Sequence, residues 1–211
     1  MFSCKPVYPP VTGWLEVGLS TEALHYLYDR IAEAKGSAKG NLAGHISSSL
    51  DLKDNNNWFT NNVLLGCANE YNEKFPYAPK RINTVGVNNL VLNGFWVNQQ
   101  REHEFNPSHN HGGVFSFVVW IKIPTKSKEQ NDQDFLKEVN DSVASDFEMS
   151  YIDTSGSVTS YMYKMNPDME GNMLFFPSTF RHGVYPFYNC KEDRISISGN
   201  LYYDKTTHEN T

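Results

Sequence analysis

The stretch "NPSHNHGGVFSFVVW", residues 106–120, places His109 and His111 two positions apart at the start of a strand-like run. Residues i and i+2 of an extended chain face the same side, so the two imidazoles would point together. Two neutral imidazoles at this spacing suit a divalent metal ion. Taken alone, an H-x-H pair is better explained as two surface histidines in a loop.

A third histidine changes this weighing. His182 lies in "FPSTFRHGVYP", directly after the run "MLFF", which reads as a buried strand. A lone histidine is more often a packed core residue or a surface residue than a ligand. Two histidines at strand spacing and a third after a later strand form a recurrent metal-binding pattern.

The segment "RISIS", residues 194–198, alternates in character. Its two isoleucines face one side of a strand, and Arg194, Ser196 and Ser198 face the other. An arginine in an otherwise apolar strand is costly to bury unless it is paired. A carboxylate is its natural partner, because a guanidinium holds one bidentately, and Ser196 can donate to the same carboxylate. The alternative is a simple ion pair of Arg194 with an Asp or Glu of the chain.

The elements that must position these residues follow from the hydrophobic pattern. Residues 20–35 predict a helix capped by Ser20 or Thr21, and residues 57–75 predict a second helix ended by Pro76. Residues 37–56 read as a loop. Residues 125–147 read as a charged excursion, partly helical around 135–139, which is either a lid over the site or a solvated loop. Strands are expected from 83 to 100 and over 114–123, 147–152, 157–165, 171–178 and 194–203.

Many short strands after a helical start predict a mainly β protein with flanking helices. We expect a single domain, residues 1–211, in which 1–82 form a helical and extended part packed on a β core at 83–204. The net charge is -6 and no basic block occurs, which argues against nucleic acid or an anionic membrane as partners. Three scattered cysteines, no secretory signal at the start and no apolar run of about 18 residues favour a cytoplasmic protein that does not span a membrane.

Taken together, H-x-H, the distal His182 and "RISIS" twelve residues later resemble the 2-oxoglutarate- and Fe(II)-dependent oxygenases. The resemblance is closest to a branch of these oxygenases found in bacteria and phages, whose members have a similar "FPS-x-x-x-H-x-V-x-P … R-[IV]-S-I-S-x-N" pattern. It covers residues 94–203 closely and "NLAGHI", residues 41–46, more loosely. The C-terminal motif is specific, whereas the H-x-H alone is not.

The resemblance implies a double-stranded β-helix, the jelly-roll core shared with cupins. It implies Fe(II) held by His109, His111 and His182, and a distal carboxylate of 2-oxoglutarate (2OG) held by Arg194 and Ser196. Asn98 and Ser116 would line the cosubstrate pocket; the alternative for both is an inward polar residue satisfied by the backbone. The implied activity is hydroxylation of a small-molecule or peptidyl substrate by O2, with release of succinate and CO2.

One position departs from the usual superfamily pattern. His111 stands where most members have Asp or Glu, so the implied ligand set carries one less negative charge. Halogenating members have a small residue at this position, which leaves a coordination vacancy. A histidine does not, so halogenation is disfavoured.

Two other functions stay open at the level of sequence. One is a cupin-type metal or small-molecule binding protein, although a cupin usually adds a Glu about four residues after H-x-H and has no role for "RISIS". The other is a catalytically silent jelly-roll used for binding or assembly. A free sheet edge would also make a homodimer plausible.

Overall fold

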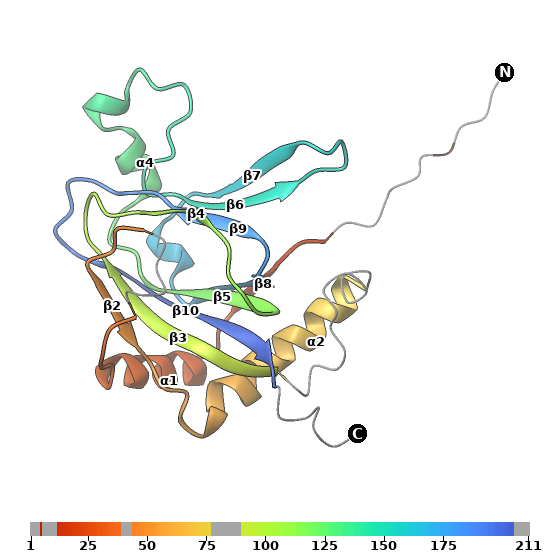
Figure 1. The fold of residues 1–211 in the computed structure, drawn as a ribbon. Helices are drawn as coiled ribbons and strands as arrows, with labels where there is room; N and C mark the ends of the chain where they lie inside the picture. The colour runs from red at the N-terminus through yellow and green to blue at the C-terminus, as the bar shows by residue number, and fades with distance from the viewer. Residues whose placement is uncertain (1–4, 6–11, 39–43, 77–89, 205–211) are drawn as a thin grey trace.

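Two antiparallel sheets face each other, and helices cover the outer side of the larger one (Figure 1). The computed structural model describes residues 5, 12–38, 44–76 and 90–204. The six-stranded sheet has the order β1-β8-β5-β10-β3-β2, with β1 at Leu15–Gly18, β2 at Ser48–Asp51, β3 at Leu90–Gln100, β5 at Phe115–Lys122, β8 at Asn172–Pro177 and β10 at Arg194–Tyr203. The four-stranded sheet has the order β4-β9-β6-β7, with β4 at Asn106–His109, β6 at Phe147–Ile152, β7 at Val158–Tyr163 and β9 at Arg181–Val184. This is the expected mainly β fold with a double-stranded β-helix core.

Both expected helices are confirmed. Helix α1 spans Thr21–Ala32, and the Ser20 side chain accepts a hydrogen bond from the backbone N–H of Ala23, which makes Ser20 the cap. Helix α2 spans Leu65–Lys74 and continues from a π-helical turn at Thr60–Leu64. None of the helices in the described ranges is long and apolar enough to cross a bilayer.

The expected loop at 37–56 is wrong at Ser48–Asp51, which forms β2 and pairs with β3. Only Leu50 is apolar in this four-residue strand, so no periodicity marks it in the sequence. Its polar side chains are used in the sheet: the Ser49 hydroxyl donates to Asn98 Oδ1 at 2.8 Å. The expected strand from residue 83 is described from Leu90 onward, and residues 83–89 lie outside the described part of the chain.

Apolar side chains form two clusters, one on each side of the six-stranded sheet. The outer cluster joins α1 and α2 to the sheet and includes Phe59, Tyr71 and Ile197. The inner cluster fills part of the space between the sheets and includes Trp120 and Phe147. Because side chains alternate along β10, Ile197 packs outward and the polar residues on either side of it face inward. The expectation that two-residue periodicity splits "RISIS" into an apolar and a polar face is confirmed.

The charged excursion between β5 and β6 contains two short helical segments, α4 at Ser127–Asn131 and a 3-10 turn at Asp134–Leu136. The turn begins one residue before the expected helical region and ends before Val139. Gln130 holds α4 to the loop after β9, because its side chain donates to the Tyr188 carbonyl and accepts from the Tyr188 N–H, at 2.9 and 2.8 Å. Two N-terminal strands, β1 and β2, form the edges of the larger sheet, while the division of the chain at residue 82 stays a prediction.

Candidate active site

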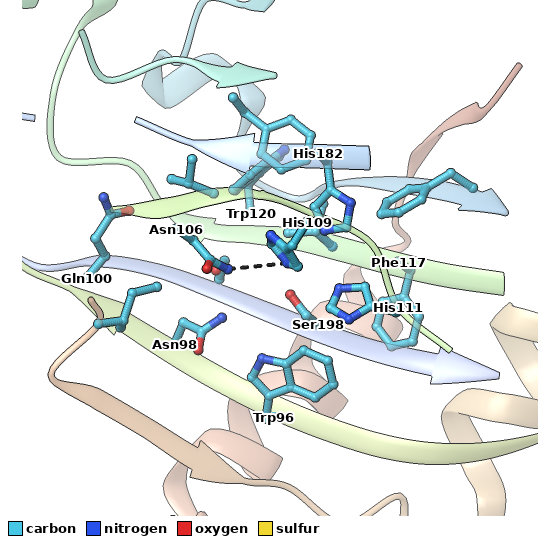
Figure 2. Close-up of a pocket in the computed structure, with 16 residues that line it drawn as sticks. Trp96, Asn98, Gln100, Asn106, His109, His111, Phe117, Trp120, His182 and Ser198 are labelled. Atoms are coloured by element: carbon cyan, nitrogen blue, oxygen red, sulfur yellow. Dashed lines mark hydrogen bonds between the residues drawn. The ribbon is translucent and has the colours of Figure 1, made fainter. Parts of the chain in front are cut away.

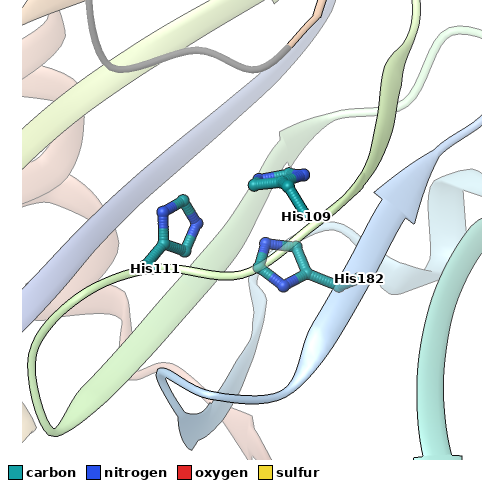
Figure 3. Close-up of side chains that lie close together, drawn as sticks. All are labelled: His109, His111 and His182. Carbon is teal, nitrogen blue, oxygen red and sulfur yellow. The ribbon is translucent and has the colours of Figure 1, made fainter.

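Three histidines converge between the two sheets. His109 lies directly opposite His182 in the pairing of β4 with β9, and His111 follows two residues later. Their candidate ligand nitrogens all lie within 4.8 Å of one another, and the rings face a common point (Figure 3). The ring centroids are 4.4 Å apart for His109 and His182, and 5.0 Å apart for His111 and His182. The histidines singled out in the sequence are therefore brought together.

Local hydrogen bonds fix the tautomers of two of these rings. His109 Nδ1 lies 2.7 Å from the Pro107 carbonyl, and His182 Nδ1 lies 3.2 Å from the Phe180 carbonyl. A carbonyl can only accept, so each Nδ1 carries the proton and each Nε2 keeps a lone pair. Backbone partners of this kind orient histidines that bind metals.

Burial keeps all three imidazoles neutral. Desolvation lowers the pKa of His109, lowers that of His111 to about 4, and lowers that of His182 well below its usual value near 6.5. The neighbouring histidines add to the effect, because two positive rings would repel each other at this distance. At neutral pH the cluster offers nitrogen lone pairs without having to release protons.

An irregularity in β4 adds a fourth polar group to the cluster. The pairing of β4 with β9 shifts between Asn106 and His109, so both side chains face inward although they are three residues apart. Asn106 Nδ2 lies 3.4 Å from His109 Nε2, and Asn106 Oδ1 is buried without a partner among the described residues. Gly183 lies opposite, where a Cβ would come within 3.3 Å of the Ser108 nitrogen. Strict alternation would have turned Asn106 outward, so no sequence pattern marks its place in the site.

A hollow between the sheets joins the histidines to the inward face of β3 and β10 (Figure 2). Its polar lining consists of Asn98, Gln100, Asn106, His109, His111, His182, Ser196 and Ser198. Two of the predicted cosubstrate residues, Asn98 and Ser196, therefore lie on it, and they pair with each other in the sheet. Trp96 and Trp120 also line it, and each has a buried indole N–H without a hydrogen-bond partner among the described residues. The two-residue period around Asn98 would have pointed to Trp96 and Gln100.

Arg194 lies at the end of the same face, paired with Gln100, and is only 2% exposed. Its Nη2 donates to the carbonyl of Ser145 at 2.8 Å and to the Ser145 hydroxyl, and its guanidinium lies 5.1 Å from the ring centroid of Phe187. Within the described part of the chain, Nε and Nη1 have no partner, and no carboxylate forms an ion pair with this arginine. Burial lowers the pKa of Arg194 to about 10, partly offset by the charge of Asp146, so the side chain stays cationic at neutral pH.

Ser116 lies elsewhere. It faces between the sheets from β5, but it is not among the residues that line the hollow. Its hydroxyl lies 2.8 Å from the Ser178 hydroxyl and 2.7 Å from Asn200 Oδ1, and all three residues are buried. Its predicted contact with a cosubstrate stays a prediction, and the contacts it makes are internal to the protein.

Comparisons with known proteins agree with this architecture. A family model described as "Putative 2OG-Fe(II) oxygenase" matches residues 94–200. No curated protein gives a significant sequence match. Among solved structures, an oxidoreductase of the 2OG-Fe(II) oxygenase family from Burkholderia pseudomallei has a TM-score of 0.50 at 13% identity, over 90% of this chain and 84% of that one. This likeness is one of fold.

Two prolyl hydroxylases also align over most of the chain. The prolyl-4-hydroxylase of Pseudomonas putida has a TM-score of 0.48 at 14% identity, over 91% of this chain and 93% of that one. The prolyl hydroxylase of Trichoplax adhaerens, solved with a peptide fragment of hypoxia inducible factor, has a TM-score of 0.49 at 13% identity, over 92% and 85%.

Proposed function

This chain belongs to the 2OG-Fe(II) oxygenase family, and on that premise we propose that it is a dioxygenase that hydroxylates its substrate using Fe(II), 2OG and O2. The observation that carries the proposal is that three neutral histidines line the hollow, while a buried arginine with two unsatisfied nitrogens lies at the end of the strand face that also lines it, although Arg194 is not itself a lining residue. A metal cation and a dicarboxylate need these two kinds of group, and few other ligands need both.

The histidine cluster fits an Fe(II) ion. Its members are His109, His111 and His182, whose nitrogens are close enough to share one ion and are neutral at the pH of a cell. Imidazole is a common ligand of iron, zinc, copper and nickel, so geometry alone does not choose among these metals. The family assignment favours iron.

The surroundings of Arg194 fit the distal carboxylate of 2OG. Arg194 is cationic, nearly inaccessible and left with two nitrogens unsatisfied, and a buried donor without a partner costs about 1–3 kcal/mol. A carboxylate that accepts from Arg194 and Ser196 would remove that cost. In this proposal Asn98 and Ser196 orient the cosubstrate from neighbouring strands.

Bound Fe(II) and 2OG would supply the oxidative chemistry, in which one atom of O2 would enter the substrate as a hydroxyl, the other would enter succinate, and CO2 would be released. The chain's own part is to bind and orient the reactants and to exclude water from the space between the sheets. Trp96, Phe176 and Phe147 supply the apolar walls for that exclusion. The substrate class, small molecule or peptide, is left to a screen.

The test is an anaerobic titration of the purified protein with Fe(II) and 2OG, followed through the weak visible charge-transfer band of the complex. Wild type should give the band, His182→Ala should lose it, and Arg194→Ala should need much more 2OG to reach it. Bound iron without a band would contradict the proposal and favour a cupin-type metal protein. A chain that binds no iron would favour a silent binding module.

A further inference from the structure

We propose that the excursion at residues 125–146 is part of the cosubstrate anchor, with Ser145 as a positioning residue for Arg194, and that binding of 2OG and docking of the excursion are coupled. The inference rests on the proposed function and deepens it. It assigns a role in the site to a segment that sequence alone presents as a charged surface loop.

The contact between Ser145 and Arg194 is direct and fully buried. Arg194 Nη2 donates to both the carbonyl and the hydroxyl of Ser145, and Ser145 has no exposed surface. No other described residue accepts a hydrogen bond from this guanidinium. The orientation of the buried cation therefore depends on one residue of the excursion and on the ring of Phe187 below it.

Ser145 is itself held in an unusual conformation. Its φ of +70° lies in the left-handed region, which costs a non-glycine residue roughly 1 kcal/mol or more. Its N–H donates to the Pro186 carbonyl at 2.8 Å, and its hydroxyl lies 3.0 Å from that of Thr125 at the other end of the excursion. Strain that is retained by three surrounding contacts points to a functional constraint on this residue.

The two ends of the excursion meet behind Arg194. Ser127, from the first end, lies 3.3 Å from Asp146 Oδ1 at the second end, and Lys164 Nζ forms an ion pair with the same carboxylate at 2.7 Å. The middle of the excursion is held separately by the two hydrogen bonds between Gln130 and Tyr188. Loss of the Ser145 hydroxyl alone would therefore leave the excursion docked.

Thermodynamic linkage makes the coupling reciprocal. Ser145 occupies Nη2, which leaves Nε and Nη1 as the nitrogens without a partner. If Ser145 improves the affinity for 2OG by orienting those nitrogens, then bound 2OG must stabilise the docked excursion by the same factor. The charged outer part of the excursion should respond to a ligand that it does not touch.

The primary test is Ser145→Gly, with Ser142→Ala as the matched control. Glycine accepts a φ of +70° without strain and keeps the backbone carbonyl acceptor, so the variant removes the hydroxyl without straining the backbone. Ser142 lies in the same excursion, and its hydroxyl accepts from the Ala144 N–H rather than contacting Arg194. Dissociation constants for Fe(II) and for 2OG are measured anaerobically by the charge-transfer band and by calorimetry, together with thermal unfolding.

We expect Ser145→Gly to raise the dissociation constant of 2OG about 5- to 10-fold, the effect of one lost hydrogen bond, with Fe(II) affinity maintained. The unfolding temperature should change little, because relief of the strain at φ +70° offsets the lost contact with the Thr125 hydroxyl. Ser142→Ala should match wild type in all three. An unchanged 2OG affinity in Ser145→Gly would overturn the inference, as would an equal loss of Fe(II) affinity and stability, which would mark Ser145 as merely structural.

A second readout tests the reciprocal effect. Lys128 and Lys137 are exposed on the excursion and offer trypsin sites. With Fe(II) bound under anaerobic conditions, 2OG should slow cleavage there in wild type and in Ser142→Ala, and should do so less in Ser145→Gly. Equal protection in all three proteins would contradict the coupling. A wild type that binds no 2OG at all removes the proposed function as well, whereas binding that depends on Arg194 but not on Ser145 removes only this inference.

Discussion

The candidate site has two ends, the histidine cluster and Arg194, and burial affects the charge of these side chains differently. At the histidine end, desolvation lowers pKa values from about 6.5 and leaves three neutral donors. At the arginine end, the same desolvation lowers the pKa of Arg194 only to about 10 and leaves a permanent cation. One physical cause therefore produces a site for a cation beside a site for an anion, because the side chains start on opposite sides of neutral pH.

Of the variants considered, removal of a histidine should have the largest effect, and the effect should fall on metal affinity. His182→Ala should weaken Fe(II) binding by about 100-fold or more, since loss of even an outer contact to a metal ligand typically costs 10- to 100-fold. The measurement is metal content after dialysis together with a calorimetric titration. His25→Ala, at an exposed histidine of α1, is the control and should bind metal as wild type does. Equal affinity in all three proteins would show that the cluster is only a packed group of histidines.

Removal of the cation should affect only the other end. Arg194→Met keeps an unbranched apolar stem but no charge, and we expect the dissociation constant of 2OG to rise roughly 10- to 100-fold, for one or two lost charge-assisted hydrogen bonds. Fe(II) affinity, measured without 2OG, should change little. Arg194→Lys should recover part of the 2OG affinity. A parallel loss of both ligands in Arg194→Met would mean that the two ends do not act separately.

Acidification should lower the folding stability through the histidine cluster and not through Arg194. The lowered pKa values mean that the folded, metal-free protein leaves these histidines neutral while the unfolded chain protonates them below about pH 6.5. Stability should therefore fall as the pH drops from about 6.5 toward 4, the pKa of His111 in the folded protein. Thermal unfolding across this range measures the loss. His111→Gln should show a shallower dependence, and an equally steep one would place the cause outside the cluster.

Ser116→Ala should have the smallest effect on 2OG affinity, and it tests whether Ser116 belongs to the group of residues that binds 2OG. The variant breaks up the hydrogen bonds with Ser178 and Asn200, which should lower the free energy of unfolding by about 1–2 kcal/mol. We expect the affinity for 2OG to stay within about twofold of wild type. Denaturant unfolding and the charge-transfer titration measure the two quantities. A tenfold loss of 2OG affinity would instead place Ser116 in the anchor.

Regular spacing explains which of these features the sequence predicted. The alternation in "RISIS" and the i, i+2 pair of His109 and His111 are local patterns, and local geometry preserves them in the fold. Asn106 was missed because a shift in strand pairing breaks the alternation that would have been used to place it. Ser145 was missed for a different reason: its neighbour Arg194 is distant in the chain, and no motif marks a contact formed only by tertiary packing.

Two of the histidines lie on different strands, so a shared metal ion would link those strands. His109 on β4 and His182 on β9 belong to a pairing with only a few aligned residues, interrupted by an irregularity. An ion shared between them would act as a cross-link that closes a loop of about seventy residues, much as a disulfide does in an extracellular protein. Metal loading would then slow amide hydrogen exchange in both strands and raise the unfolding temperature, so the concentration of the free ion would set the stability of this pairing.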